Sequence, residues 1–345
     1  MTTFLGLDYA VWWYLVIGAT VSLYAVLDGF DLGAGLLHPF FRKEESRRIA
    51  LNAVGPVWDG NEVWLVITGG ALFAGFPEAY ATAFSAFYTP FFLLLAALIG
   101  RAVSIEFRSK EPMAWWRKFW DWSYFLASFV ISILLGVALG NLMVGLPVDA
   151  EGIYQGAGLL DMLKPLPLAV GLTVAALYAV HGSLYLLLKT EDKLFDRVRR
   201  LNRTALLLFY AAMALSTALV FGWCPEVMAR IWHRPGWMGL AGLAFILSML
   251  IPLWVNQKRF TLAFLSSALM IMSLLGLVFA QQFPLLIPSP IDPDGGMSLW
   301  EAASSERTLR LLLIITLIGG PLVVGYFVFV YRAFRGKVRL DDMSY

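Results

Sequence analysis

Long apolar stretches alternate with short polar segments along the whole chain. Nine of these stretches are close to or above the roughly 20 apolar residues that a helix needs to cross a bilayer, and we expect a transmembrane helix in each. Because a helix satisfies its own backbone polar groups, this pattern predicts an all-α, polytopic membrane protein. The expected helices lie near residues 10–38, 51–75, 79–106, 121–145, 165–188, 204–223, 237–255, 260–282 and 309–331.

Composition supports the membrane interpretation. Of the 345 residues, 59% are hydrophobic and only 14% are charged, and the mean hydropathy is +0.72, outside the range of soluble domains. The single cysteine excludes an intramolecular disulfide framework and a cysteine-ligated iron–sulfur cluster. No basic patch interleaved with aromatic residues is present, so we expect no nucleic-acid partner.

The distribution of basic residues predicts the orientation in the membrane. Alternate loops hold 20 of the 26 Lys and Arg residues and the opposite loops hold five, while Arg101 lies inside the third expected helix. Basic residues are enriched in cytoplasmic loops. We therefore predict nine crossings, with the N-terminus outside and the C-terminus in the cytoplasm.

No linker in the sequence separates soluble domains, so residues 1–345 are expected to form a single membrane domain. The basic loop at 189–203 divides it into helices 1–4, at about 10–145, and helices 5–9, at about 165–331. This division is compatible with two four-helix bundles and a peripheral ninth helix.

Acidic residues in the first two expected helices carry the candidate chemistry. Asp28 and Asp31 are three residues apart and share a helix face, and Asp59 and Glu62 repeat that spacing. Carboxyl groups are costly inside a membrane, and a buried one can exchange protons near neutral pH. We expect Asp59 to be enclosed in this way and to belong, with Glu62 and Asp28, to a proton pathway.

Structural roles are an open alternative for other charged residues. Asp121 is expected to open the fourth helix, where an acid can cap free amides and complement the helix dipole. Arg101 can form an ion pair that locks helices together, and Glu106, close to Arg108 and Lys110, is expected at a solvated rim.

Three histidines bear on haem binding, because haem iron usually takes an axial histidine. His38 is at a helix end before Pro39, and His233 lies in an exterior loop. His181 is expected inside the membrane, where a lone histidine more often packs through hydrogen bonds than binds haem. We expect no haem ligand and no metal site in this chain.

Five stretches resemble subunit II of the cytochrome bd-type quinol oxidases. The resemblance runs from the first helix to the last and is densest over residues 24–147. The sequence does not distinguish the cyanide-insensitive branch of the family. The stretches are "LDGFDLGAGLL", "GPVWDGNEVWLVITGGALFAGFPEAYATAFSAFY", "RAVSIEFRSK", "WDWSYFLASFVISILLGVALGNLMVGLP" and "SLWEAASSERTL".

The resemblance implies a haem-free subunit of a heterodimer in the bacterial cytoplasmic (inner) membrane. Subunit I is then expected to carry two b-type haems and one d-type haem and to oxidise ubiquinol or menaquinol. The complex reduces O2 to water with protons taken from the cytoplasm, which generates a proton motive force in the respiratory chain. A small single-helix accessory subunit is left open.

The resemblance also implies roles for individual residues. The aspartate of the family's "WDGN" motif, assigned to a proton pathway, falls on Asp59. Family members can hold a quinone in subunit II near positions that match Asp31, Arg101 and Asp121. Whether these three bind quinone or form a structural polar cluster is left open.

Two further functions are compatible with the residues alone. The intramembrane carboxylates suit the coupling site of a secondary transporter. Alternatively, the chain is a purely structural partner subunit, in which every acid forms an ion pair or a cap.

Overall fold

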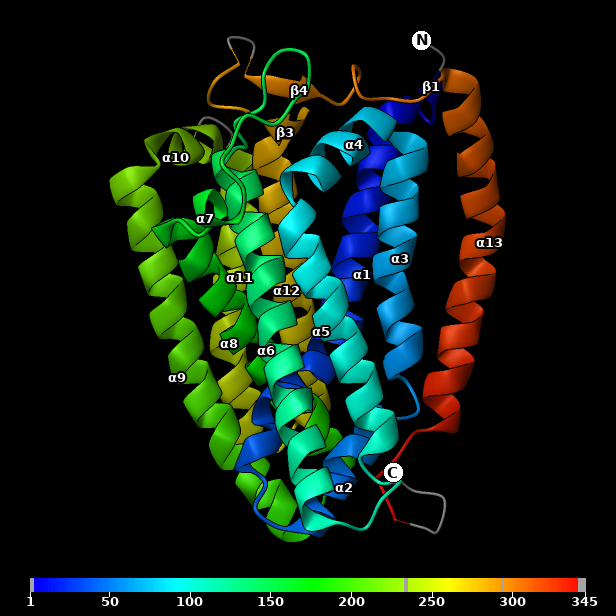
Figure 1. Ribbon diagram of the computed structural model, residues 1–345, viewed down its shortest axis with the longest axis vertical. Helices are drawn as coiled ribbons and strands as arrows, with labels where there is room; N and C mark the ends of the chain where they lie inside the picture. The colour runs from blue at the N-terminus through cyan, green and yellow to red at the C-terminus, as the bar shows by residue number, and fades with distance from the viewer. Residues whose placement is uncertain (1–2, 233–234, 293–294, 341–345) are drawn as a thin grey trace.

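A computed structural model describes residues 3–232, 235–292 and 295–340, and these form nine long helices that run side by side (Figure 1). The predicted all-α, polytopic membrane fold is confirmed. The long helices are α1 (Tyr9–Leu37), α3 (Trp58–Gly75), α5 (Tyr88–Phe107), α6 (Ala114–Val144), α8 (Pro165–Lys189), α9 (Asp192–Trp223), α11 (Pro235–Asn256), α12 (Phe260–Gln282) and α13 (Glu306–Ala333).

Eight of these helices, within the described ranges, have the length and hydropathy of a membrane span. The other, α3, has only 18 residues, and its first turns carry Asp59, Asn61 and Glu62. The helix expected at 51–75 is in fact two, because Gly55 and Pro56 separate α3 from the amphipathic α2 (Glu44–Val54). Nine crossings and the orientation stay predictions.

Other expected boundaries were also wrong, because two helices begin before their apolar stretch and a further expected helix is divided in two. The fourth helix begins at Ala114 rather than near 121, and the sixth begins at Asp192 rather than near 204. The stretch expected at 79–106 is divided between α5 and the short α4 (Pro77–Ala86), which crosses the ends of its neighbours (Figure 1).

Short elements close the two ends of the molecule (Figure 1). One end carries two antiparallel hairpins and three short helices, and the other carries η1 (His38–Phe40), α2 and the C-terminal segment. The elements at the N-terminal end are β1 (Thr3–Phe4), β2 (Leu7–Asp8), β3 (Leu285–Pro288), β4 (Gly296–Ser298), α4, α7 (Leu159–Met162) and α10 (Pro225–Trp232).

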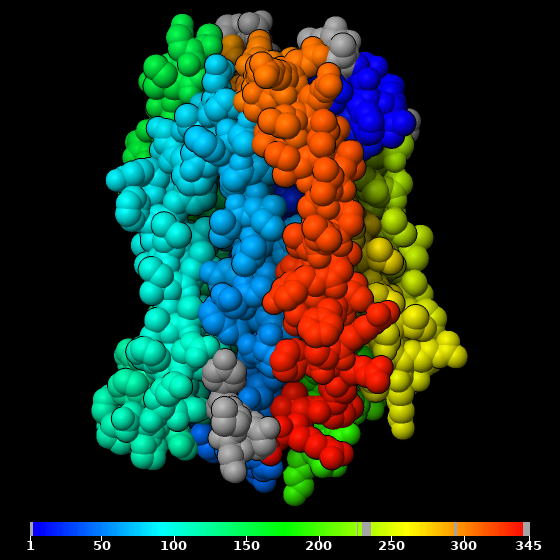
Figure 2. Space-filling model, turned by 90° about the vertical axis from the view of Figure 1, so that its right-hand side faces the viewer, coloured from blue at the N-terminus to red at the C-terminus, as the bar shows by residue number. Residues whose placement is uncertain are grey.

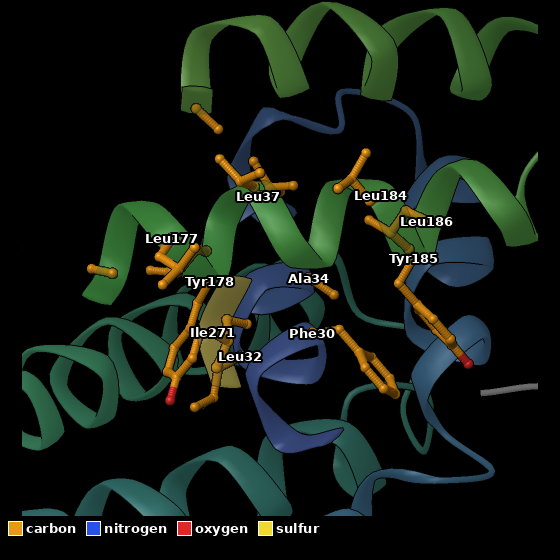
Figure 3. Close-up of a cluster of buried hydrophobic side chains, with 14 of the residues drawn as sticks. Phe30, Leu32, Ala34, Leu37, Leu177, Tyr178, Leu184, Tyr185, Leu186 and Ile271 are labelled. Carbon is orange, nitrogen blue, oxygen red and sulfur yellow. The ribbon is translucent and has the colours of Figure 1, made fainter. Parts of the chain in front are cut away.

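Helix α8 forms the centre of the core. It packs against α1, α6, α9 and α12, so the two predicted groups of helices are in direct contact through it. Where α1 crosses α8, Gly33 and Gly182 face each other, and a Cβ at Gly182 would lie 2.5 Å from the carbonyl carbon of Gly33. Phe30 and Tyr185 stack nearby with ring centroids 3.9 Å apart (Figure 3). Glycines such as Gly33 and Gly182 permit close approach of helices in a membrane, where the hydrophobic effect does not drive helices together.

Helix α13 lies along the outside of the bundle, beside α3 (Figure 2). Hydrogen bonds attach it near both ends. The indole of Trp13 donates to the carbonyl of Leu309 at 2.9 Å, and the hydroxyl of Tyr331 donates to Oδ1 of Asn61 at 2.8 Å. Between these points its side chains are mostly exposed, which matches the predicted peripheral helix.

The glycine contact between α1 and α8 yields a first prediction. In Gly33→Ala, the added methyl group would overlap the carbonyl of Tyr178, and backbone cannot move aside as a side chain can. We expect a loss of about 1–3 kcal/mol or more, seen as a lower midpoint of thermal unfolding in detergent. Gly222→Ala on α9 is the control, because nothing lies within 4 Å of its new methyl group. Equal midpoints for the two variants would contradict the packing argument.

Candidate functional site

Arg101 on α5 connects three helices. Its Nη1 donates to Oδ1 of Asp28 on α1 at 2.7 Å, and its Nη2 donates to Oε2 of Glu62 on α3 at 2.6 Å. The side chains of Arg101 and Asp28 are fully buried, while that of Glu62 is 23% exposed. Charges removed from water are tolerated when they are paired and hydrogen-bonded. The predicted ion pair of Arg101 is therefore present, with two partners.

A second set of hydrogen bonds lies one helical turn further along α1. Nδ2 of Asn61 donates to Oδ2 of Asp31 at 2.7 Å, and Tyr331 donates to the same amide. Asp31 and Asn61 are both buried. The Asp31 carboxylate also interacts electrostatically with Asp28, Arg101 and Glu62, so the two sets form one group, termed the Arg101 cluster: Asp28, Asp31, Asn61, Glu62 and Arg101.

The spacing of acids along the sequence explains this arrangement. Residues three apart lie on one helix face, so α1 presents Asp28 and Asp31 together toward α3 and α5. Helix α3 likewise turns Asn61 and Glu62 toward the cluster. The sequence predicted that Asp28 and Asp31 share a helix face. That these acids meet Glu62 at Arg101 is seen in the described residues.

Asp59 is not enclosed as expected. It is exposed in the first turn of α3 and lines a small cavity of about 120 Å³ between the start of α3 and the end of α13. Asn61 and Tyr331 line the same cavity from its inner side. The first turn of α3 is at the edge of the bundle, so a residue two positions before buried Asn61 faces outward. Glu62 interacts electrostatically with Asp59, which connects the exposed acid to the Arg101 cluster.

Asp121 belongs to a different cluster from Asp31 and Arg101. Its Oδ1 is 2.5 Å from Nε2 of His38 and accepts from Nε of Arg108 at 2.6 Å, and its Oδ2 accepts from Arg47 at 2.9 Å. Glu44 extends the network, since both of its carboxylate oxygens accept from Arg108, at 3.0 and 2.9 Å. We call these five residues the Asp121 cluster.

The capping role left open for Asp121 was wrong. Helix α6 begins at Ala114, so Asp121 is two turns inside the helix and is buried against η1, α2 and the end of α5. One turn further, Tyr124 donates to the carbonyl of Asp31 at 3.2 Å, which links α6 to α1. Arg108, counted with the loop residues, is only 1% exposed on its side chain.

Five partners in the two clusters were missed in the sequence: His38, Glu44, Arg47 and Arg108 around Asp121, and Tyr331 beside Asn61. Arg108 precedes Asp121 by 13 residues across a helical hairpin, and this spacing was a usable signal for the pair. Tyr331 is 270 positions from Asn61, and its contact depends on where α13 docks.

The buried histidines have partners. In His181, the hydroxyl of Ser267 is 2.7 Å from Nδ1, and Nε2 donates to the carbonyl of Val26 at 2.9 Å. The hydrogen-bonded packing expected of His181 is present, and the absence of a haem ligand in this chain stays a prediction. His233 lies outside the described residues. Among the described residues, no three His, Cys, Asp or Glu side chains are grouped closely enough to hold a metal ion.

Glu44 lies outside the membrane-spanning helices, and its pKa is perturbed. Partial burial acts to raise the pKa, but hydrogen bonds and charge from Arg108, together with the charge of Arg117, outweigh burial and hold the pKa below its usual range. The carboxylate is thus ionised at neutral pH and fixes Arg108 in place.

A polytopic all-α membrane subunit with a buried acid–arginine network is the class of protein that this fold and site define. The profile of the family described as "Cytochrome bd terminal oxidase subunit II" matches residues 9–334. This chain therefore belongs to the cytochrome bd terminal oxidase subunit II family. The expectation of a subunit of a quinol:oxygen oxidoreductase is confirmed, and the membership favours it over a secondary transporter.

Individual relatives can be aligned with this chain over almost its whole length. The chain is 31% identical over 362 positions to "Cytochrome bd-I ubiquinol oxidase subunit 2" of Escherichia coli strain K12, covering 96% of each. It is also 31% identical over 337 positions to "Cytochrome bd ubiquinol oxidase subunit 2" of Bacillus subtilis strain 168, covering 96% of this chain and 98% of that one. The fold is similar to a chain in the structure of the bd oxidase from Geobacillus thermodenitrificans, with a TM-score of 0.77, 18% identity, and 95% and 99% of the chains covered.

Breaking the Arg101 ion pairs should be strongly destabilising. Arg101→Gln leaves two carboxylates without their cation, and loss of one partner from a buried pair costs about 3–5 kcal/mol. We expect a large fall in the thermal unfolding midpoint and in the yield of assembled complex. The double variant Arg101→Gln/Asp28→Asn should be less destabilised than Arg101→Gln alone. If the two losses simply add, Asp28 and Arg101 are not coupled as described.

Acid should remove the contribution of Glu44 to stability. A lowered pKa in the folded state means that the stabilisation is present above the unfolded pKa, about 4.3, and is lost as pH falls through the folded value. Glu44→Gln should therefore unfold at a lower temperature than wild type at pH 7. The loss in the free energy of unfolding should be at most about 1 kcal/mol, because the pair is partly exposed. The difference should shrink toward pH 3.5. Glu45→Gln, also exposed at the start of α2, is the control and should match wild type.

Proposed function

We propose that this chain is the haem-free subunit II of a bd-type quinol oxidase in the bacterial cytoplasmic membrane, and that it conducts protons from the cytoplasm toward a haem-bearing subunit I. Subunit I supplies two b-type haems and one d-type haem, and the heterodimer oxidises quinol and reduces O2 to water. The names of the Escherichia coli and Bacillus subtilis relatives, both ubiquinol oxidases, support quinol as the electron donor.

The proposal rests on the excess of carboxyl groups over cations in the Arg101 cluster. Asp28, Asp31 and Glu62 share a single cation, because Arg101 alone, of the described residues bonded to them, is positively charged. Three carboxyl groups around one guanidinium leave room for protons to bind and leave. Within the described residues, Oδ2 of Asp28 and Oδ1 of Asp31 make no hydrogen bond, although the Tyr24 hydroxyl lies beside Asp28. These oxygens are available to accept protons.

The exposure of the carboxyl groups decreases from Asp59 to Asp28, and this order suggests a route for protons. Asp59 is exposed, Glu62 is partly exposed, and Asp28 is fully buried. Protons would enter at Asp59, pass to Glu62 on the same helix, and reach Asp28 across Arg101. Asp59 is in the first turn of α3, and α3 begins toward the end of the molecule that carries α2, which is the end predicted to be cytoplasmic from the distribution of basic loops (Figure 1). Subunit I would then cover Asp59 and exclude lipid from it.

The histidines support haem in the partner subunit. Nε2 of His38 is engaged by Asp121, and both ring nitrogens of His181 have hydrogen-bond partners. At His181 a haem iron would have to displace one of these partners to gain an axial ligand, and at His38 the remaining nitrogen, Nδ1, is buried inside the protein. Haem chemistry, when present, supplies electron transfer and O2 reduction, and this chain would hold and pass protons.

For Asp31, Arg101 and Asp121 we infer structural roles rather than a quinone site. Both terminal nitrogens of Arg101 donate to carboxylates, and Asp121 is held by three donors from three elements. A quinone oxygen would compete with charge-assisted hydrogen bonds of 2.5–2.9 Å.

A purely structural subunit is the second candidate. The observation that favours it is the pairing of Asp28 and Glu62 with Arg101, which satisfies part of the cluster without any proton transfer. It predicts that neutralising one carboxyl group changes stability and leaves turnover unchanged.

Asp59→Asn separates the two candidates. The variant keeps the size of the side chain and removes the titratable group at an exposed position, so folding should be preserved. We expect O2 consumption with quinol to fall by about an order of magnitude or more, with an unchanged haem spectrum and unfolding midpoint. Asp196→Asn, an exposed acid on α9, is the control and should retain full turnover. Full turnover in Asp59→Asn would reject the proton route and favour the structural subunit.

A further inference from the structure

A cavity of about 430 Å³ opens beside the Asp121 cluster, where η1, α2 and the start of α6 meet. It is the larger of the two described cavities, and it lies at the same end of the molecule as α2 (Figure 1). Charged side chains from two regions of the chain line it. These include Glu44 and Arg47 of α2 and Arg117, Lys118 and Asp121 of α6.

The charges around this cavity favour an anion. Arg47, Arg117 and Lys118 line it, and buried Arg108 stands behind them, against the two carboxylates of Glu44 and Asp121. Both carboxylates are already paired: Asp121 with Arg47 and Arg108, and Glu44 with Arg108 and Arg117. Lys118 is exposed, and within the described residues it makes no ion pair. The cations exceed the anions by two, so the cavity attracts negative charge.

An apolar stripe leads away from the same cavity along α6. Phe119, Trp122, Leu126 and Phe129 are spaced by three or four residues and therefore share a helix face. All four are exposed, from 38% at Phe129 to 58% at Leu126, and Trp122 also lines the cavity. A cationic cavity that continues into an exposed apolar stripe on a membrane helix fits an amphiphile with an anionic head.

We propose that this cavity binds the headgroup of one anionic phospholipid, with an acyl chain along the stripe of α6. The headgroup phosphate would lie among Arg47, Arg117 and Lys118, where basic side chains attract anionic lipids. A zwitterionic lipid brings no net charge to balance the excess, and free phosphate has no chain to cover the stripe. The proposal needs only the membrane location of the chain and holds whether or not the proton route is correct.

Lipid titration of the purified oxidase complex, followed by native mass spectrometry in mild detergent, tests this site. Phosphatidylglycerol and phosphatidylcholine are added separately to wild type and to Arg117→Gln/Lys118→Gln. The variant should bind phosphatidylglycerol about tenfold more weakly than wild type at one site, while phosphatidylcholine binds equally to both. The control is Arg199→Gln/Arg200→Gln, which removes the same charge from the polar start of α9 and should behave as wild type.

Equal phosphatidylglycerol affinity in wild type and the cavity variant would overturn the proposal. Equal affinity of wild type for the two lipids would overturn it as well, and so would displacement of phosphatidylglycerol by millimolar inorganic phosphate. A quinone that co-purifies at this position and blocks the lipid would also reject it. Lys118→Gln alone keeps the test decisive if the double variant does not fold, because Lys118 takes part in no described ion pair and its loss should still weaken binding several-fold.

Discussion

The burial of one guanidinium constrains the first half of the molecule. Arg101 has no exposed surface, so it is stable only where carboxylates from other helices reach it. Asp28 and Glu62 meet this requirement from α1 and α3, which fixes the rotation of both helices about their axes. With that rotation set, Asp31 faces Asn61, and Asp59 faces outward. The acid–base arrangement of the site is thus a consequence of how a single cation is accommodated.

Much of the fold was predictable, because apolar length and the distribution of basic loops are direct physical consequences of a bilayer. The boundaries of the helices were less predictable. Helices α6 and α9 continue for several polar turns beyond the apolar stretch, and hydropathy alone does not detect such extensions. The break between α2 and α3 was signalled by Pro56, yet the apolar residues on both sides suggested one continuous helix.

For the site, the three-residue spacing of the acids predicted that Asp28 and Asp31 share a helix face, and an ion pair of Arg101 was a structural role left open. That Asp28 and Glu62 are its partners depends on how α1, α3 and α5 pack together. Exposure was not predictable in this way, as Asp59 shows, because it depends on which side of the first turn of α3 the neighbouring helices cover. The separation of Asp121 from Asp31 and Arg101 could also not be predicted from the sequence. Its partners His38 and Arg108 come from helix ends that the sequence suggested were solvated.

The hydrogen bond between Tyr331 and Asn61 has a consequence for biosynthesis. Asn61 emerges early during translation, whereas its partner Tyr331 comes 270 positions later, in α13. The amide that holds Asp31 therefore stays incomplete until α13 has been made and has docked. A ribosome that stalls or terminates before residue 331 leaves a buried amide oxygen unsatisfied, and such an unpaired group costs about 1–3 kcal/mol. The hydrogen bonding of the amide beside Asp31 thus depends on the docking of α13.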